Sequence, residues 1–304
     1  MHISRYHNTA KYTAAALSLA LMLLASGCGN EQQPQDGKLI AVASIQPYAS
    51  LLAHMGGDRI QVLTLVPSGQ NPHTFQLTPG KMQQLSSARL ALINGANLEP
   101  WGDRIDELIT ERKGRVLRVS ELHGYHDEHH GHDHEHNDPH YWLDPMAMTE
   151  VVDALEEALS ALDPDAADGY KVRAAALKDS LSRLDADIAA LLEGVREKHI
   201  IISHAGWAQF FDRYGLENIV VIEEMPGKEV SANKVAMLTD IIEAEGVTTA
   251  FGQMQTNSAL LRSTAEETGC TVMYVDPLGT PETSLDYFEL MRYNAAQFQQ
   301  GLAR

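Results

Sequence analysis

Histidine, a residue type that can bind metal, is concentrated in one short segment of this chain. The segment "HGYHDEHHGHDHEHNDPHYWLDP", residues 123–145, holds eight of the fourteen histidines. Neutral imidazole is a preferred ligand of zinc and of several other transition metals. Between His123 and Asn137, however, the only large apolar side chain is Tyr125, so burial cannot offset the entropy of ordering the backbone there. We therefore expect a mobile His-rich loop, residues 123–137, that binds metal only weakly.

Seven histidines of this loop are the expected auxiliary ligands: His123, His126, His129, His130, His132, His134 and His136. They alternate with acidic residues, and they could collect zinc or sense its abundance. The alternative is a solvated insert that has no part in metal uptake.

Two other histidines are expected in ordered surroundings in the first half of the chain. His73 follows an apolar run in "VPSGQNPHTF", where Pro and Gly residues indicate a stiff turn. His140 lies in "DPHYWLDP", between two Asp-Pro pairs, and Trp142 beside it needs to be buried. Each position alone is more often an ordinary surface or hydrogen-bonding histidine, so the inference depends on finding partners.

The second half of the chain supplies such partners at the ends of predicted strands. His204 ends the run "IIISH", and Asp276 ends the run "TVMYVD". Ligands of open α/β sheets bind outside the carboxyl ends of strands, and each of the four side chains follows a predicted strand or a stiff turn. Three imidazoles and one carboxylate can complete a tetrahedral zinc site, and imidazole nitrogen favours zinc over manganese.

Strands and helices alternate along the chain, which predicts an α/β fold with parallel sheets covered by helices. The expected strands are 39–44, 60–67, 90–95, 115–120, 199–204, 219–224, 248–253 and 271–276. A run of about 34 residues without an internal proline separates the first four from the last four. Its apolar residues repeat every three or four positions, at Leu177, Leu181, Leu184, Ile188 and Leu191, which indicates one amphipathic helix.

We therefore predict two similar lobes, each with a mostly parallel sheet flanked by helices, joined by one long rigid α-helix. The N-terminal lobe covers residues 39–163, the linker helix 164–198 and the C-terminal lobe 199–304. With 304 residues, each lobe is long enough to bury a core of its own. A single rigid connector limits relative motion, so the cleft between the lobes is expected to close only modestly.

Four segments of the chain resemble a known family: "NPHTFQLTP", "DPHYWLDP", "ISHAGWAQFFDRYGL" and "VDPLG". They are similar to the signature segments of the metal-binding solute-binding proteins of bacterial ABC importers, called cluster A-I or the periplasmic solute-binding protein 9 family. The resemblance spans Leu39 to Arg304. It implies two α/β lobes bridged by one rigid helix, and a permease and its ATPase as partners.

The resemblance also implies the ligands and the cargo. His73, His140 and His204 would be the imidazole ligands, and Asp276 the fourth ligand, with Glu223 as the alternative because some manganese members use a glutamate in that lobe. The His-rich insert before "DPH" is typical of zinc members, so Zn²⁺ is the expected cargo. Because protons compete for imidazole, zinc affinity is expected to fall below about pH 6.

The N-terminus predicts export and anchoring. Residues 1–27 combine a basic start, a short apolar run and small residues, which are typical of a signal peptide. The ending "LASGC" resembles a bacterial lipobox, which implies lipidation of Cys28, and residues 28–38 are expected to form a polar tether. The protein is expected as a monomer in the periplasm or on the outer face of the cytoplasmic membrane.

Charge and missing motifs argue against other function classes. The formal net charge of −18 disfavours nucleic acid as a partner. The sequence contains neither H-E-x-x-H nor G-x-S-x-G, so we expect no enzyme of the corresponding hydrolase classes. Two alternatives stay open at this stage: manganese as the cargo, and a surface lipoprotein with a role in adhesion.

Overall fold

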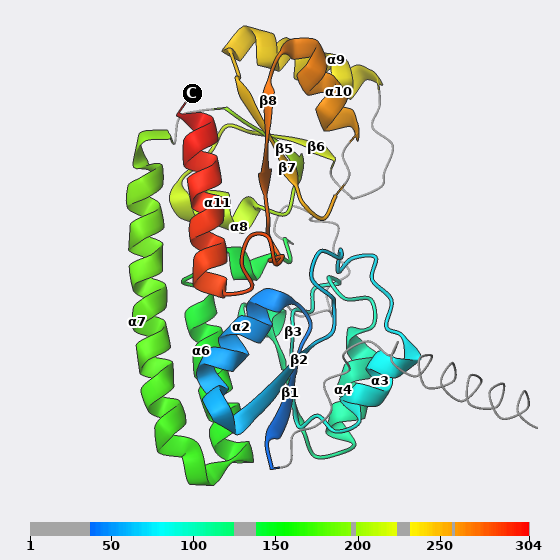
Figure 1. Ribbon diagram of the computed structural model, residues 1–304, viewed down its shortest axis with the longest axis vertical. Coiled ribbons are helices and arrows are strands. Elements are labelled where there is room, and N and C mark those ends of the chain that lie inside the picture. Colours follow the sequence, from blue (N-terminus) through cyan, green and yellow to red (C-terminus); the bar gives the residue numbers. More distant parts are fainter. Residues whose placement is uncertain (1–36, 125–137, 196–198, 224–231, 257–258, 304) are drawn as a thin grey trace, which may run out of the picture. The chain divides into compact units, whose positions relative to one another are not determined.

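The computed structural model describes residues 37–124, 138–195, 199–223, 232–256 and 259–303 (Figure 1). Within this part, two four-stranded sheets lie near opposite ends of one long helix, α7. No helix among these residues is both long enough and apolar enough to cross a membrane.

The N-terminal sheet has the strand order β2-β1-β3-β4, and all neighbouring pairs are parallel. Because each connection between parallel strands must cross over the sheet, helices fill the connections. The elements in chain order are β1 (Leu39–Ala43), α2 (Gln46–Gly56), β2 (Ile60–Thr64), α3 (Pro79–Leu85), β3 (Leu90–Ile93), α4 (Gly102–Thr110), β4 (Arg115–Arg118) and α5 (Val119–Leu122).

The C-terminal sheet repeats this topology with the order β6-β5-β7-β8, again parallel throughout. The strand order reverses beside β5, which creates a topological switch point between β5 and β7, where ligands of such sheets bind. The elements are β5 (Ile200–His204), α8 (Ala208–Tyr214), β6 (Ile219–Glu223), α9 (Ala232–Glu245), β7 (Thr249–Gln253), α10 (Ala259–Thr268), β8 (Thr271–Val275) and α11 (Tyr287–Leu302).

Two helices lie between the sheets in the sequence: α6 (Met148–Leu162) and α7 (Ala167–Leu192). The linker helix α7 is shorter than the 34 residues expected, because short 3-10 turns occupy 164–166 and 193–195. Its apolar side faces α6 and α11, which run beside it in Figure 1. The predicted leucine repeat is correct up to Ile188. The next buried position is then Leu192, whereas Leu191 is 42% exposed.

The sequence predicted a separate hydrophobic core in each lobe, but the main core is shared between the two lobes. A single cluster runs from the N-terminal sheet through α6 and α7 to one face of the C-terminal sheet. A smaller second cluster covers the other face of that sheet beneath α9 and α10. It consists of Ile201, Ile222, Leu238, Ile242, Ala250 and Leu261. The two lobes are therefore joined by shared apolar packing as well as by the chain.

Candidate metal centre

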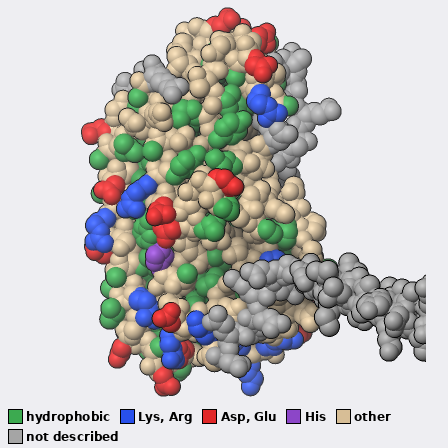
Figure 2. All heavy atoms as spheres, in the orientation of Figure 1, with side chains coloured by type: hydrophobic (Ala, Val, Ile, Leu, Met, Phe, Trp, Pro, Cys, Tyr) green, Lys and Arg blue, Asp and Glu red, His purple; other side chains and the backbone are tan. Residues whose placement is uncertain are grey.

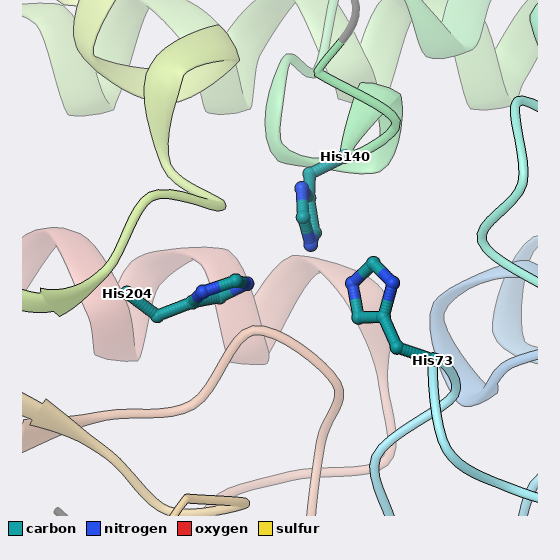
Figure 3. Close-up of side chains that lie close together, drawn as sticks. All are labelled: His73, His140 and His204. Atoms are coloured by element: carbon teal, nitrogen blue, oxygen red, sulfur yellow. The ribbon is translucent and has the colours of Figure 1, made fainter. Parts of the chain in front are cut away.

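Three imidazoles from both lobes converge on one point. The ring centroids of His73, His140 and His204 are 5.5, 5.6 and 5.9 Å apart. One ligand nitrogen from each ring lies within 4.8 Å of the other two. Figure 3 shows the rings pointing toward one another from three separate segments of the chain. Such a set can hold one transition-metal ion through nitrogen.

His73 is positioned by the turn that follows β2. Asn71 Oδ1 accepts a hydrogen bond of 2.9 Å from the His73 backbone N–H, the Asx turn typical of such a segment. Burial, with a smaller contribution from nearby His140, lowers the pKa of His73 to about 4. Its Nε2 is buried and has no hydrogen-bond partner among the described residues. His73 is therefore neutral at ordinary pH and offers a nitrogen lone pair.

His140 is oriented by Asp138, two residues before it. Asp138 Oδ1 accepts a 3.1 Å hydrogen bond from the His140 backbone N–H and also contacts Nδ1 of the ring. Burial raises the pKa of Asp138, but the hydrogen bonds and charge of His140 outweigh burial and bring it below its ordinary value. A carboxylate on Nδ1 fixes the tautomer of a metal-binding histidine and leaves Nε2 for the metal.

His204 is the last residue of β5, beside the switch point of the C-terminal sheet. Gly206, two residues later, lies directly against His140. A Cβ atom at residue 206 would stand 2.6 Å from His140 Nε2, closer than real Cβ contacts. A glycine at this position therefore lets the loop after β5 approach the imidazole of the other lobe.

Hydrogen bonds between the lobes hold the surroundings of the cluster. Trp142 Nε1 donates to the Pro277 carbonyl (2.6 Å), and the Tyr287 hydroxyl donates to the Trp142 carbonyl (2.8 Å). Ser68 Oγ donates to the Gly279 carbonyl (2.8 Å). The segment after β8 is thus bonded to the lobe that carries His73 and His140. The cluster faces a cavity lined by Asn71, Pro72, His73, His140, Trp142, His204, Gln253, Gln255, Pro277 and Leu278.

Asp276 and Glu223 are the two candidates for the fourth ligand. Asp276 is fully buried and is not among the residues that line the cavity, and among the described residues the close group of possible ligands contains the three histidines without it. Glu223 ends β6, where its backbone pairs with His204, and its side chain lies outside the described residues. Asp276 as the fourth ligand stays a prediction.

Of the seven auxiliary histidines, only His123 belongs to the described structure. Its ring stacks on Tyr141 at 5.1 Å, and its Nδ1 lies 3.3 Å from Glu150 Oε2. Burial lowers its pKa. His123 therefore packs against the folded protein. The other six histidines, like Cys28 and the whole of residues 1–36, lie outside the described residues.

Sequence reasoning overlooked three residues around the cluster: Asp138, Gly206 and Gln255. A carboxylate two residues before a candidate histidine was a usable signal for Asp138, because such residues commonly contact the ring of a metal-binding histidine. Gly206 and Gln255 carried no comparable signal, since their roles depend on contacts between segments far apart in the sequence.

Together, the fold and the cluster define a two-lobed α/β protein with three histidines that could hold a metal ion between two parallel sheets. The profile of the ZnuA family, described as zinc-uptake complex component A, periplasmic, matches residues 41–301, and the chain belongs to this family.

Individual relatives agree with this assignment. The chain is 25% identical over 295 residues to the manganese-binding lipoprotein MntA of Halalkalibacterium halodurans, covering 94% of this chain and 97% of the relative. It is 26% identical over 296 residues to the zinc-binding lipoprotein AdcA of Streptococcus pneumoniae, covering 92% of this chain and 58% of AdcA. The chain therefore spans little more than half the length of AdcA. A crystal structure of ZnuA superimposes with a TM-score of 0.77 at 26% identity, over 87% of this chain and 99% of that one.

Proposed function

We propose that this protein is the extracytoplasmic zinc receptor of a bacterial ABC importer. It would capture Zn²⁺ between its lobes through His73, His140 and His204, with Asp276 as the fourth ligand, and deliver the ion to a permease driven by its ATPase. The observation that supports this most is the convergence of three imidazole nitrogens within 4.8 Å of one another. The proposal is for binding and release of a cargo ion, not for catalysis.

Donor chemistry favours zinc over manganese. Zinc accepts imidazole nitrogen in tetrahedral sites, whereas manganese prefers carboxylate, carbonyl and water oxygens. Two relatives point in different directions, because AdcA is named for zinc and MntA for manganese. A zinc-bound structure of a ZnuA deletion mutant resembles this chain with a TM-score of 0.76 at 26% identity. Manganese is therefore the second candidate cargo, and three nitrogen ligands argue against it.

A metal titration tests the proposal. Purified protein is stripped with a chelator, and zinc and manganese are titrated in competition with a chromophoric chelator. We expect one tight zinc equivalent and a much lower affinity for manganese. His140→Ala and His204→Ala should each weaken the tight site by more than about a hundredfold, beyond the range typical of residues that only orient a ligand. His54→Ala, a histidine on α2 outside the cluster, is the matched control. Equal affinities in the control and in the cluster variants would contradict the assignment.

The His-rich loop is proposed as an auxiliary collector or sensor of zinc. Its charge and imidazole content favour several weak sites, and His123 connects it to the folded lobe beside Tyr141. Deleting residues 125–136 should remove the weak zinc equivalents and leave the tight one. Loss of the tight equivalent would mean that the main site includes the loop.

The proposed location is extracytoplasmic, with the protein anchored through a lipid on Cys28 and acting as a monomer. Two relatives are named lipoproteins, and the N-terminal sequence agrees with that form. Mass spectrometry of membrane-extracted protein should show the lipid on Cys28. The negative net charge argues against nucleic acid as a partner, and on the face drawn in Figure 2 acidic and basic side chains are interspersed.

A further inference from the structure

The Asp276 carboxylate accepts four hydrogen bonds, three of them at one oxygen. Its Oδ1 accepts from the backbone N–H groups of Leu278 (3.0 Å) and Gly279 (2.9 Å) and from Gln255 Nε2 (2.6 Å). Its Oδ2 accepts from the Thr283 hydroxyl (2.6 Å). The side chain is also completely buried. Because three donors already occupy Oδ1, a metal ion can bind this oxygen only in exchange for one of these bonds, or by distorting them.

Of the four donor residues, Gln255 and Leu278 line the cavity that holds the three imidazoles, and of these two only Gln255 donates from its side chain. Leu278 and Gly279 donate from the backbone of the tight turn that follows β8, and Thr283 lies outside the lining residues. The Gln255 amide can leave the carboxylate by side-chain rotation alone, so among the donors from cavity-lining residues it is the one that a metal can displace without moving the backbone.

The Gln255 side chain is held by its hydrogen bond to Asp276. Its backbone is fixed at the end of β7, where Met254 N–H donates to the Val275 carbonyl at 3.1 Å and Thr256 N–H donates to the Gln253 carbonyl at 3.2 Å. Its Oε1 is buried and has no hydrogen-bond partner among the described residues. The amide orientation follows from chemistry, because only the NH₂ group can donate to a carboxylate.

We propose that Gln255 is a positioning residue that competes with bound zinc for the Asp276 carboxylate. The inference rests on the proposed function. When zinc binds, the Gln255–Asp276 hydrogen bond would be exchanged for a bond between zinc and Asp276. When zinc leaves, the amide would recapture the carboxylate. A hydrogen bond to a charged group is among the stronger ones, so this exchange weakens zinc binding and speeds release to the permease.

A double-mutant cycle tests the competition. Removing the donor in Gln255→Leu should tighten zinc binding about tenfold and slow dissociation, measured by chelator competition and by stopped-flow transfer to a chelator in excess. In the Asp276→Asn background the same substitution should have no effect, because the competing carboxylate is gone. Gln253→Leu is the matched control, because Gln253 lines the same cavity but Gln255 is the glutamine that donates to Asp276. The Gln253→Leu variant should not bind zinc more tightly than the wild-type protein.

Weaker zinc binding by Gln255→Leu, or an equal effect in the wild-type and Asp276→Asn backgrounds, would overturn the inference and indicate that the amide itself binds the metal or only fills space. Gln255→Ala repeats the test with a different side-chain volume, and thermal unfolding of the metal-stripped variants shows whether each is folded. Failure of the proposed function gives a different result: the wild-type protein would then lack tight zinc binding, or keep it in His140→Ala.

Discussion

The two lobes hold their candidate ligands in opposite ways. In the N-terminal lobe, nearby side-chain oxygens accept hydrogen bonds from His73 and His140. In the C-terminal lobe, the candidate ligand Asp276 itself accepts the hydrogen bonds. Asn71 and Asp138 each lie two residues before the histidine that they hold. Asp276, by contrast, receives donors from Gln255, from its own turn and from Thr283.

This difference separates two tasks of a metal receptor. The side with His73 and His140 is already held in place by hydrogen bonds, so little entropy would be lost if these imidazoles bind zinc as proposed. If zinc binds Asp276 Oδ1 as proposed, it must displace a hydrogen bond there, which favours release. A receptor that delivers its cargo needs both properties, because an affinity that is too high would slow transfer.

The largest expected effect is the change of zinc affinity with pH. His73 has a pKa of about 4 and is already deprotonated between pH 5 and 6, so at most two imidazoles can exchange protons for zinc in that range. We expect the logarithm of the zinc affinity to rise by no more than about two per pH unit, or about a hundredfold. Competition titrations at closely spaced pH values measure the slope. A slope near three would show that His73 is not held in its neutral form.

The lowered pKa of His73 also makes the stability of the fold depend on pH. In the unfolded chain His73 regains an ordinary pKa near 6.5, so the unfolded state binds the proton first. This residue's contribution to the free energy of unfolding is therefore complete above about pH 6.5 and decreases as the pH falls toward 4. Urea unfolding of metal-stripped protein at pH 7 and pH 5 should show the decrease, and His73→Ala should reduce it.

The next test removes the carboxylate that orients His140. Asp138→Ala should lower zinc affinity between about tenfold and a hundredfold, the usual cost of losing such a partner. Asp144→Ala is the matched control, because Asp144 closes the same segment but faces Arg213. If both variants bind zinc equally well, then Asp138 does not orient the ring.

A smaller effect is expected from adding one methyl group between the lobes. Gly206→Ala would place a Cβ 2.6 Å from His140 Nε2, so either the ring or the loop after β5 must move. Zinc affinity should fall by about tenfold. Gly194→Ala is the control, because the space around residue 194 is open. Unchanged binding in Gly206→Ala would show that the two lobes separate more easily than their shared core suggests.

The smallest effect is expected at the edge of the lobe interface, where His54 Nε2 lies 2.7 Å from Asp286 Oδ2. The hydrogen bond with Asp286 raises the pKa of His54, so the contact stabilises the fold below about pH 6.5 and is lost as the pH rises through the raised value. Because the pair is partly exposed, His54→Ala should cost less than about 1 kcal/mol. Urea unfolding of the wild-type protein and of His54→Ala at pH 6 and pH 9 measures how the stability lost in the variant depends on pH. An equal loss of unfolding free energy at both pH values would exclude the ion pair.

The sequence was informative where local pattern and chemistry coincide. The eight strands follow from short apolar runs ending in turns, and all of them form within a few residues of their expected bounds. The three histidines could be chosen because each follows a strand or a stiff turn, and the structure brings them together. The strand order within each sheet and the division of the core were not predictable in this way, since both depend on contacts between distant residues.

By itself, the sequence determined the α/β class, the positions of the elements, the family resemblance and the three imidazoles, because periodicity, turn residues and ligand chemistry are local properties. Only the tertiary structure decided that one core runs through both lobes, that Gly206 meets His140, and that Gln255 holds Asp276. The physical reason is that each of these depends on the distance between segments that the chain brings together only when it folds.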